Sequence, residues 1–258
     1  MTRQAVWIAA AFALAVPCVH AQQGGPGAAP QTPKTAKASA PIDLTGYWVS
    51  VVTEDWRWRM VTPSKGDYAG VPITQAAKDL ADTWNPGKDD AAGEQCRSYG
   101  APALMRVPER VRIGWENENT LKVETDAGMQ TRLFHFGDWK SPGGPPKWQG
   151  DSIARWEMPR ASIVGGGAAA TPRSGTLKVV TDHLRPGYLR KNGLPYSARA
   201  LLTEYWDVFR EPNGDQWLVI TTLVEDPIYL QGQWVTSLHF KREPDGARWD
   251  PTPCSSRW

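Results

Sequence analysis

Apolar and polar residues alternate in short segments along most of the chain after residue 42. This period of two is typical of strands that bury one face. Short turn-forming stretches separate several segments, for example at 116–119 and 212–215, and such connections join antiparallel neighbours. The pattern predicts nine strands, at 46–61, 111–116, 120–126, 129–136, 151–158, 175–183, 199–209, 216–225 and 233–242.

Only one stretch, residues 73–84, has helical spacing, with Ala76, Leu80 and Trp84 on one face and Thr74 as a possible N-cap. A long antiparallel meander removes its exposed edges most completely by closing into a barrel. We therefore predict an all-β protein, an antiparallel up-and-down meander of eight to nine strands closed into a barrel. One short helix lies on the first long connection, and an open sandwich is the alternative.

The two ends of the chain differ in composition. Residues 1–21 contain Arg3, an apolar run and small residues suited to cleavage after Ala21, which is the pattern of a secretory signal peptide. Residues 22–41 lack aromatic side chains and predict a disordered linker. Residues 42–258 then form a single β-barrel domain, in a protein that is periplasmic or secreted.

Overall charge and composition exclude several classes of protein. The formal net charge is only +2 with 22% charged residues, and the sequence has no cluster of lysine and arginine residues. We therefore do not expect nucleic acid as a partner. No segment after the leader is long and apolar enough for a transmembrane helix. The chain lacks a P-loop and a G-x-S-x-G motif, and we expect no cofactor. Its later histidines, at 135, 183 and 239, have no ligand motif around them, so no metal site is predicted.

Two cysteines remain after the leader, Cys96 and Cys254. In an oxidising compartment an isolated pair is expected to form a disulfide. The alternative is two unpaired structural thiols, but a lone exposed thiol outside the cytoplasm is a liability.

The first and last predicted strands carry Gly46-Tyr47-Trp48 and Arg242. In these positions the chain resembles the lipocalin and calycin superfamily, whose first strand has a Gly-x-Trp motif and whose last strand supplies an Arg over that Trp. The resemblance implies a lipocalin-like barrel closed at one end by Trp48 and Arg242. A disulfide that ties the C-terminal tail to the barrel would also suit that family.

A second resemblance covers most of the domain. The chain is similar to a group of secreted bacterial proteins of unassigned function. This resemblance implies a fold and a compartment but no activity. The stretches that carry it are 46–60, 185–197, 202–207, 224–230 and 238–254.

The first predicted strand has one aromatic face. If Trp48 points into the barrel, alternation carries Glu54, Trp56 and Trp58 inward with it. These rings would line a ligand cavity, and Arg57, on the charged face, is a further candidate for contacting a ligand or orienting a substrate. Alternatively, the Trp rings belong to an ordinary core, and a β-bulge near residue 53 turns Glu54 to solvent.

A second candidate segment is the loop at 185–199, which mixes basic and aromatic side chains. Tyr188, Arg190 and Tyr196 could bind a ligand there, because Arg offers bidentate hydrogen bonds and Tyr a stacking surface. The alternative is a solvated connection. Among the acids, Glu204 shares a strand face with Leu202 and Trp206, so it joins Glu54 as a candidate inward acid for catalysis.

Three functions are compatible with these patterns. The first is a secreted or periplasmic binding protein that holds a small apolar or aromatic molecule in the Trp-lined barrel. The second is an enzyme on the same barrel, with an inward carboxylate as general acid or base on a small molecule. The third is an envelope protein that binds another protein through exposed rings such as Trp139, Trp148 and Trp249.

Overall fold

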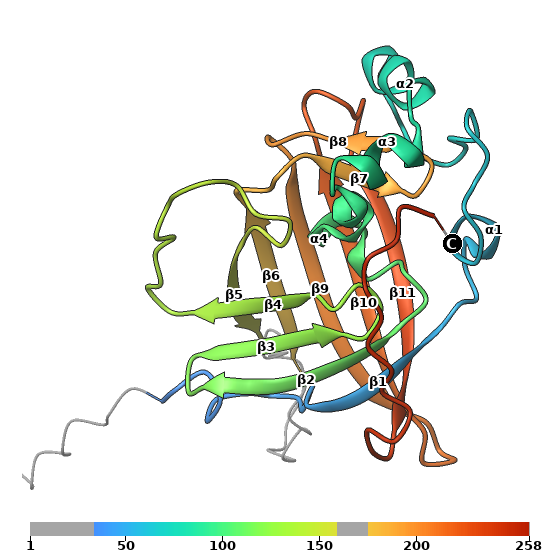
Figure 1. Ribbon diagram of the computed structural model, residues 1–258. Coiled ribbons are helices and arrows are strands. Elements are labelled where there is room, and N and C mark those ends of the chain that lie inside the picture. The colour runs from blue at the N-terminus through green and yellow to red at the C-terminus, as the bar shows by residue number, and fades with distance from the viewer. Residues whose placement is uncertain (1–33, 159–174, 258) are drawn as a thin grey trace, which may run out of the picture. The chain divides into compact units, whose positions relative to one another are not determined.

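The computed structural model describes residues 34–158 and 175–257, and within them nine strands form a closed barrel (Figure 1). The predicted all-β barrel is therefore confirmed. The predicted signal peptide at 1–21 and residues 22–33 of the predicted linker lie outside the described residues. The barrel strands are β1 (Gly46–Val51), β2 (Arg110–Asn117), β3 (Thr120–Thr125), β4 (Thr131–Phe136), β5 (Asp151–Glu157), β6 (Thr176–Asp182), β9 (Leu201–Arg210), β10 (Gln216–Glu225) and β11 (Trp234–Glu243).

Around the barrel the strand order is β1-β11-β10-β9-β6-β5-β4-β3-β2. The pairs are antiparallel except one: β4 and β5 run parallel, with Phe134 opposite Ser152 and Phe136 opposite Ala154. The prediction of a wholly antiparallel meander is wrong at this pair. A parallel neighbour needs a connection that returns to the starting end of the sheet, and residues 137–150 provide it.

Inward side chains fill the barrel in two zones. One zone is apolar and contains Trp48, Phe134, Trp206 and Phe240, all fully buried. The indole N–H of Trp48 donates to the Leu44 carbonyl at 2.9 Å. The other zone is polar, and its centre is an ion pair between Arg132 and Glu204.

The first strand is shorter than its alternation predicted. β1 ends at Val51, and Asp55 adopts a left-handed conformation (φ 52°) before the short helix α1 (Trp56–Arg59). Asp tolerates this conformation better than most residues. Contacts distant in sequence hold the turn, because Arg59 Nε donates to the Arg106 carbonyl at 2.9 Å and Arg106 Nη2 to Asp55 Oδ2 at 3.0 Å.

Helices and a hairpin gather at one end of the barrel (Figure 1). They are α2 (Gln75–Asp82), α3 (Pro86–Ala91), the 3₁₀ helix η1 (Gln95–Tyr99), α4 (Ala101–Leu104), β7 (Gly187–Arg190) and β8 (Leu194–Tyr196). The predicted helix at 73–84 is confirmed as α2, capped by the Thr74 hydroxyl. The other helices were missed because a helix of one turn carries no periodic pattern. The segment predicted as a loop at 185–199 instead forms the β7–β8 hairpin.

The two ends of the described chain pack against the barrel. The predicted disulfide is confirmed, with an S–S distance of 2.03 Å between Cys96 and Cys254. Ala36, from the range predicted as a linker, donates its N–H to Asn119 Oδ1 at 2.8 Å and accepts from Trp156 Nε1 at 2.9 Å. In the described part of the chain, no helix has the length and apolar character needed to cross a membrane.

Candidate functional site

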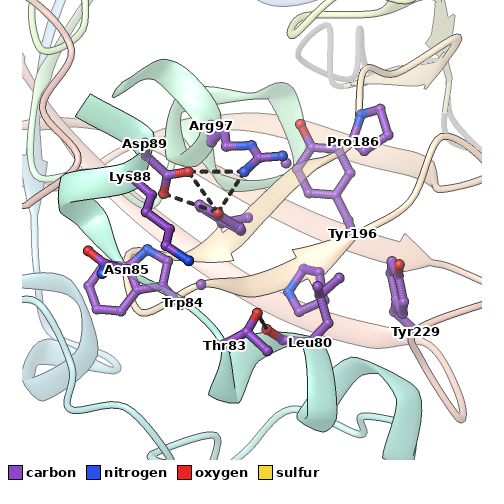
Figure 2. A pocket seen from close by; sticks show the side chains of 14 residues that line it. Leu80, Thr83, Trp84, Asn85, Lys88, Asp89, Arg97, Pro186, Tyr196 and Tyr229 are labelled. Carbon is purple, nitrogen blue, oxygen red and sulfur yellow. Dashed lines mark hydrogen bonds and ion pairs between the residues drawn. The ribbon is translucent and has the colours of Figure 1, made fainter. Parts of the chain in front are cut away.

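A cleft of about 250 Å³ lies between helices α2 and α3 and the β7–β8 hairpin. Figure 2 shows the side chains that surround it. The cleft therefore opens among the elements that gather at one end of the barrel. Its lining residues are Leu80, Thr83, Trp84, Asn85, Lys88, Asp89, Arg97, Pro186, Gly187, Tyr188, Gly193, Pro195, Tyr196 and Tyr229.

Two glycines let the hairpin approach the helices closely. Gly193 has a φ of 82°, and a Cβ atom there would lie 2.3 Å from the Cβ of Trp84. A Cβ at Gly187 would lie 2.5 Å from the Arg97 carbonyl oxygen. Because both distances are far below van der Waals contact, a larger residue at either position would push the hairpin away and widen the cleft.

Aromatic rings supply much of the apolar surface of the cleft. They are Trp84, Tyr188, Tyr196 and Tyr229, of which Tyr196 is fully buried. The Trp84 indole nitrogen is also buried and has no hydrogen-bond acceptor among the described residues. Because this nitrogen is closed off from solvent, Trp84 offers the cleft the apolar surface of its ring rather than a hydrogen-bond donor.

Asp89, Arg97 and Tyr188 form a hydrogen-bonded group in the wall of the cleft. Figure 2 shows the side chains of Asp89 and Arg97 turned toward each other. Arg97 Nη1 donates to Asp89 Oδ1 and to the Tyr188 hydroxyl, at 3.0 Å in both cases. The Tyr188 hydroxyl donates to Asp89 Oδ2 at 3.1 Å. Burial raises the pKa of Tyr188 to about 12, so the phenol remains protonated at neutral pH. The group fixes the Tyr188 ring in place and neutralises Asp89.

The predicted binding residues separate into two places, because Arg57 and Arg190 both lie over the Trp58 ring, each 4.7 Å from its centroid. Tyr188 and Tyr196 line the cleft together, whereas Arg190 contacts the Trp58 ring elsewhere, 4.7 Å from its centroid. Trp56 is 66% exposed on α1, and Arg57 forms an ion pair with Asp67 at 2.7 Å. The prediction that Trp56 and Trp58 continue the inward face of β1 is wrong, because the strand ends before them.

The two candidate acids also lie apart. Glu204 is fully buried inside the barrel and accepts from Arg132 Nη1 at 2.9 Å and from Nη2 at 2.5 Å. Glu54 follows β1, pairs with Arg59, and contacts His239 Nδ1 at 3.1 Å. A carboxylate held by two N–H groups and closed off from solvent is a structural group rather than an acid or base for a substrate.

The remaining sequence candidates have structural partners. Trp139 stacks on His135 with ring centroids 4.1 Å apart. Arg185 lies 4.3 Å from the centroid of the Trp148 ring, and Trp249 makes an edge contact with Tyr47. Within residues 34–158 and 175–257, no group of three or more His, Cys, Asp or Glu side chains is arranged to hold a metal ion.

Sequence reasoning missed most of the residues that shape the cleft, among them Trp84, Asp89, Arg97 and Tyr229. In the sequence, Trp84 stands out only as the last apolar residue of the helical pattern, which makes it a candidate for the core. Nothing in the local pattern around the other three indicates a site, because α3 and η1 meet the hairpin only through long-range packing.

The protein is thus a closed, nine-stranded, mixed β-barrel whose described part carries an aromatic cleft beside its helices. Comparisons with models of protein families, with curated proteins and with solved structures find no match to this chain.

Proposed function

We propose that this protein binds a small aromatic molecule in the cleft between α2, α3 and the β7–β8 hairpin. The observation that carries the proposal is that four of the residues lining the cleft are aromatic: Trp84, Tyr188, Tyr196 and Tyr229. Apolar walls with a few convergent polar groups are characteristic of small-molecule sites.

The size and charge of the cleft limit the ligand. A volume of about 250 Å³ is below the range of about 300–1,000 Å³ typical of drug-sized ligands, so one or two fused rings fit best. Lys88, on α3, is one of the residues that line the cleft (Figure 2). Its ammonium group favours a ligand with a polar or anionic substituent, while Asp89 is already neutralised by Arg97.

We put the ligand in this cleft rather than inside the barrel. Trp56 and Trp58, which were expected to line a barrel cavity, belong to α1. Trp48, Phe134 and Trp206 pack together in the barrel core instead. A ligand there would have to displace large side chains that are already well packed.

We further propose that the barrel is of the lipocalin kind and that the protein is exported. The lipocalin proposal is supported by Arg242, whose guanidinium carbon lies 5.4 Å from the centroid of the Trp48 ring and which pairs with Trp48 across β1 and β11. Export is supported by the Cys96–Cys254 disulfide, because disulfides persist in oxidising compartments. Mass spectrometry of the N-terminus after cell fractionation tests cleavage after Ala21.

The binding proposal is tested by titrating the full chain with indole, 4-hydroxybenzoate and cyclohexanol while Trp fluorescence is recorded. We expect saturable binding of the aromatic compounds and much weaker binding of the aliphatic one. Trp84→Ala should weaken aromatic binding by at least about tenfold, because it removes an aromatic ring from the wall of the cleft.

Trp249→Phe is the matched control, since Trp249 contacts Tyr47 and is not a lining residue of the cleft. This variant should bind as the wild type does. Unchanged affinity in Trp84→Ala, or no saturable binding of either aromatic compound, would refute the proposal.

A further inference from the structure

A small basic pocket lies beside Leu189 and Arg190, at the end of β7. Its lining residues include four basic side chains and no acidic one. Its volume is about 20 Å³, close to that of a single water or one oxygen atom of an oxyanion. The lining residues are Trp58, Arg59, Ser98, Ala103, Arg106, Val107, Leu189, Arg190 and Lys191.

Arg190 is the least compensated of these basic side chains. It is only 4% exposed, and its Nη1 donates to the Ala69 carbonyl at 2.8 Å. Among the described residues, no carboxylate oxygen lies within the 4.0 Å that defines an ion pair with Arg190, and its Nε has no acceptor. The guanidinium instead lies between the rings of Trp58 and Trp234, at 4.7 and 5.9 Å from their centroids.

The neighbouring arginines already use the nearby acids. Arg59 pairs with Glu54, and Arg106 pairs with Asp55 at 3.0 Å. Even so, Nη1 of Arg106 is buried without an acceptor among the described residues. Two buried guanidiniums, Arg106 and Arg190, therefore line one pocket with N–H donors that nothing in the described chain accepts.

The electrostatic consequence is an excess of buried positive charge. Burial and the nearby Arg106 lower the pKa of Arg190 to about 10, which still leaves it charged at neutral pH. Buried charges in proteins are normally paired, because an unpaired one loses its hydration without compensation. An anion in the pocket would supply the missing partner.

We infer that Arg190 and Arg106 bind the carboxylate group of a small molecule at this pocket. A carboxylate is flat and accepts from guanidinium N–H groups in a matching geometry. One of its oxygens fits a space of about 20 Å³, and the flat group matches the planar guanidinium fork better than a tetrahedral phosphate does. This site is separate from the aromatic cleft, since the two have no lining residue in common.

The test uses the full chain in a zwitterionic buffer. Sodium acetate, sodium phosphate and sodium chloride are titrated separately, and the midpoint of thermal unfolding is followed by Trp fluorescence. We expect acetate to raise the midpoint saturably, as binding to the native state requires, and at lower concentration than the other two salts.

Two variants make the test specific. Arg190→Met should abolish the response to acetate. Arg190→Lys keeps the charge but loses the guanidinium fork, so it should bind acetate at least about tenfold more weakly. Arg155→Met removes one exposed arginine on β5, whose partner is Glu157, and should respond as the wild type does.

Several outcomes would overturn the inference. One is a wild-type response to acetate in Arg190→Lys or Arg190→Met. Another is the absence of saturation with acetate, which indicates a general salt effect. Tighter binding of phosphate or chloride than of acetate would overturn the assignment to a carboxylate. Trp84→Ala should retain the response to acetate, so failure of the cleft proposal and failure of this one are distinguishable.

Discussion

Arg132 on β4 and Glu204 on β9 form an ion pair whose side chains are both completely buried inside the barrel. They are 72 residues apart in the sequence. Arg132 Nη2 also lies 3.3 Å from the Thr181 hydroxyl oxygen. The pair thus links three strands across the polar zone of the interior.

Removing one partner of this pair should destabilise the fold strongly. Arg132→Met leaves Glu204 buried without a counter-charge, and we expect a loss of about 3–5 kcal/mol in the free energy of unfolding. The double variant Arg132→Met with Glu204→Met should recover most of that loss, because two apolar side chains need no partner. Urea denaturation measures both.

Arg112→Met is the control, since it breaks a partly exposed ion pair with Glu124 and should cost under about 1 kcal/mol. A double variant as unstable as Arg132→Met alone would contradict the interpretation that the unpaired charge is the main cost.

Gly46 should be intolerant of a side chain. Its φ is 116°, and a Cβ atom would lie 3.0 Å from Arg242 Nη2, the guanidinium that covers Trp48. We expect Gly46→Ala to lower the free energy of unfolding by about 1–3 kcal/mol through backbone strain.

Gly114→Ala offers a matched comparison within the barrel, because nothing lies within 4 Å of its Cβ position and its φ is ordinary. This substitution should be neutral or stabilise by up to about 1 kcal/mol. Equal effects of the two substitutions in urea denaturation would argue against strain at Gly46.

Lys191 should make stability depend on pH. Burial lowers its pKa to about 7 from an ordinary value of 10.5, although the opposite charge of Glu109 acts in the other direction. Between these values the unfolded chain binds a proton that the native state lacks, so the contribution of Lys191 to stability rises with pH across that window. The slope approaches about 1.4 kcal/mol per pH unit.

The measurement is the difference in free energy of unfolding between the wild type and Lys191→Met, from urea denaturation at several pH values. Relative to Lys191→Met, the wild type should become more stable as the pH rises from about 7 to about 10.5. The difference should stay constant outside that range. A difference independent of pH would rule out the lowered pKa.

The disulfide should stabilise the C-terminal tail and the η1 segment together. Cys96→Ser with Cys254→Ser is expected to lower the free energy of unfolding by about 2–5 kcal/mol, because the bond closes a loop over 158 residues. Reductant should destabilise the wild type by a similar amount and leave the double variant unchanged. If reductant also destabilised the double variant, its effect on the wild type could not be assigned to the Cys96–Cys254 bond.

Local patterns were sufficient to locate the nine barrel strands, although not the end of the first. Alternation predicted β10 and β11 to within one residue at each end, since one face of each strand is buried and the other is not. The helix at 73–84 and its Thr74 cap were also predicted correctly. Its predicted apolar face was wrong, because α2 buries Ala77 and Ala81 while Leu80 is 44% exposed. The Trp48 and Arg242 motif and the two cysteines likewise indicated contacts that the structure contains.

The site, by contrast, depended on contacts between distant residues. The alternation at 46–61 continues past Val51, and only packing against Arg106 shows that the chain leaves the sheet there. Tyr188 meets Asp89 and Arg97 from about ninety residues away in sequence.

The sequence by itself therefore determined the class of fold, because burial of one strand face leaves a local, periodic record. Tertiary structure alone decided which side chains share the aromatic cleft, which surround Arg190, and which lie in the barrel interior. The physical reason is that a site is made by long-range packing of loops and short helices, whose positions no local period records.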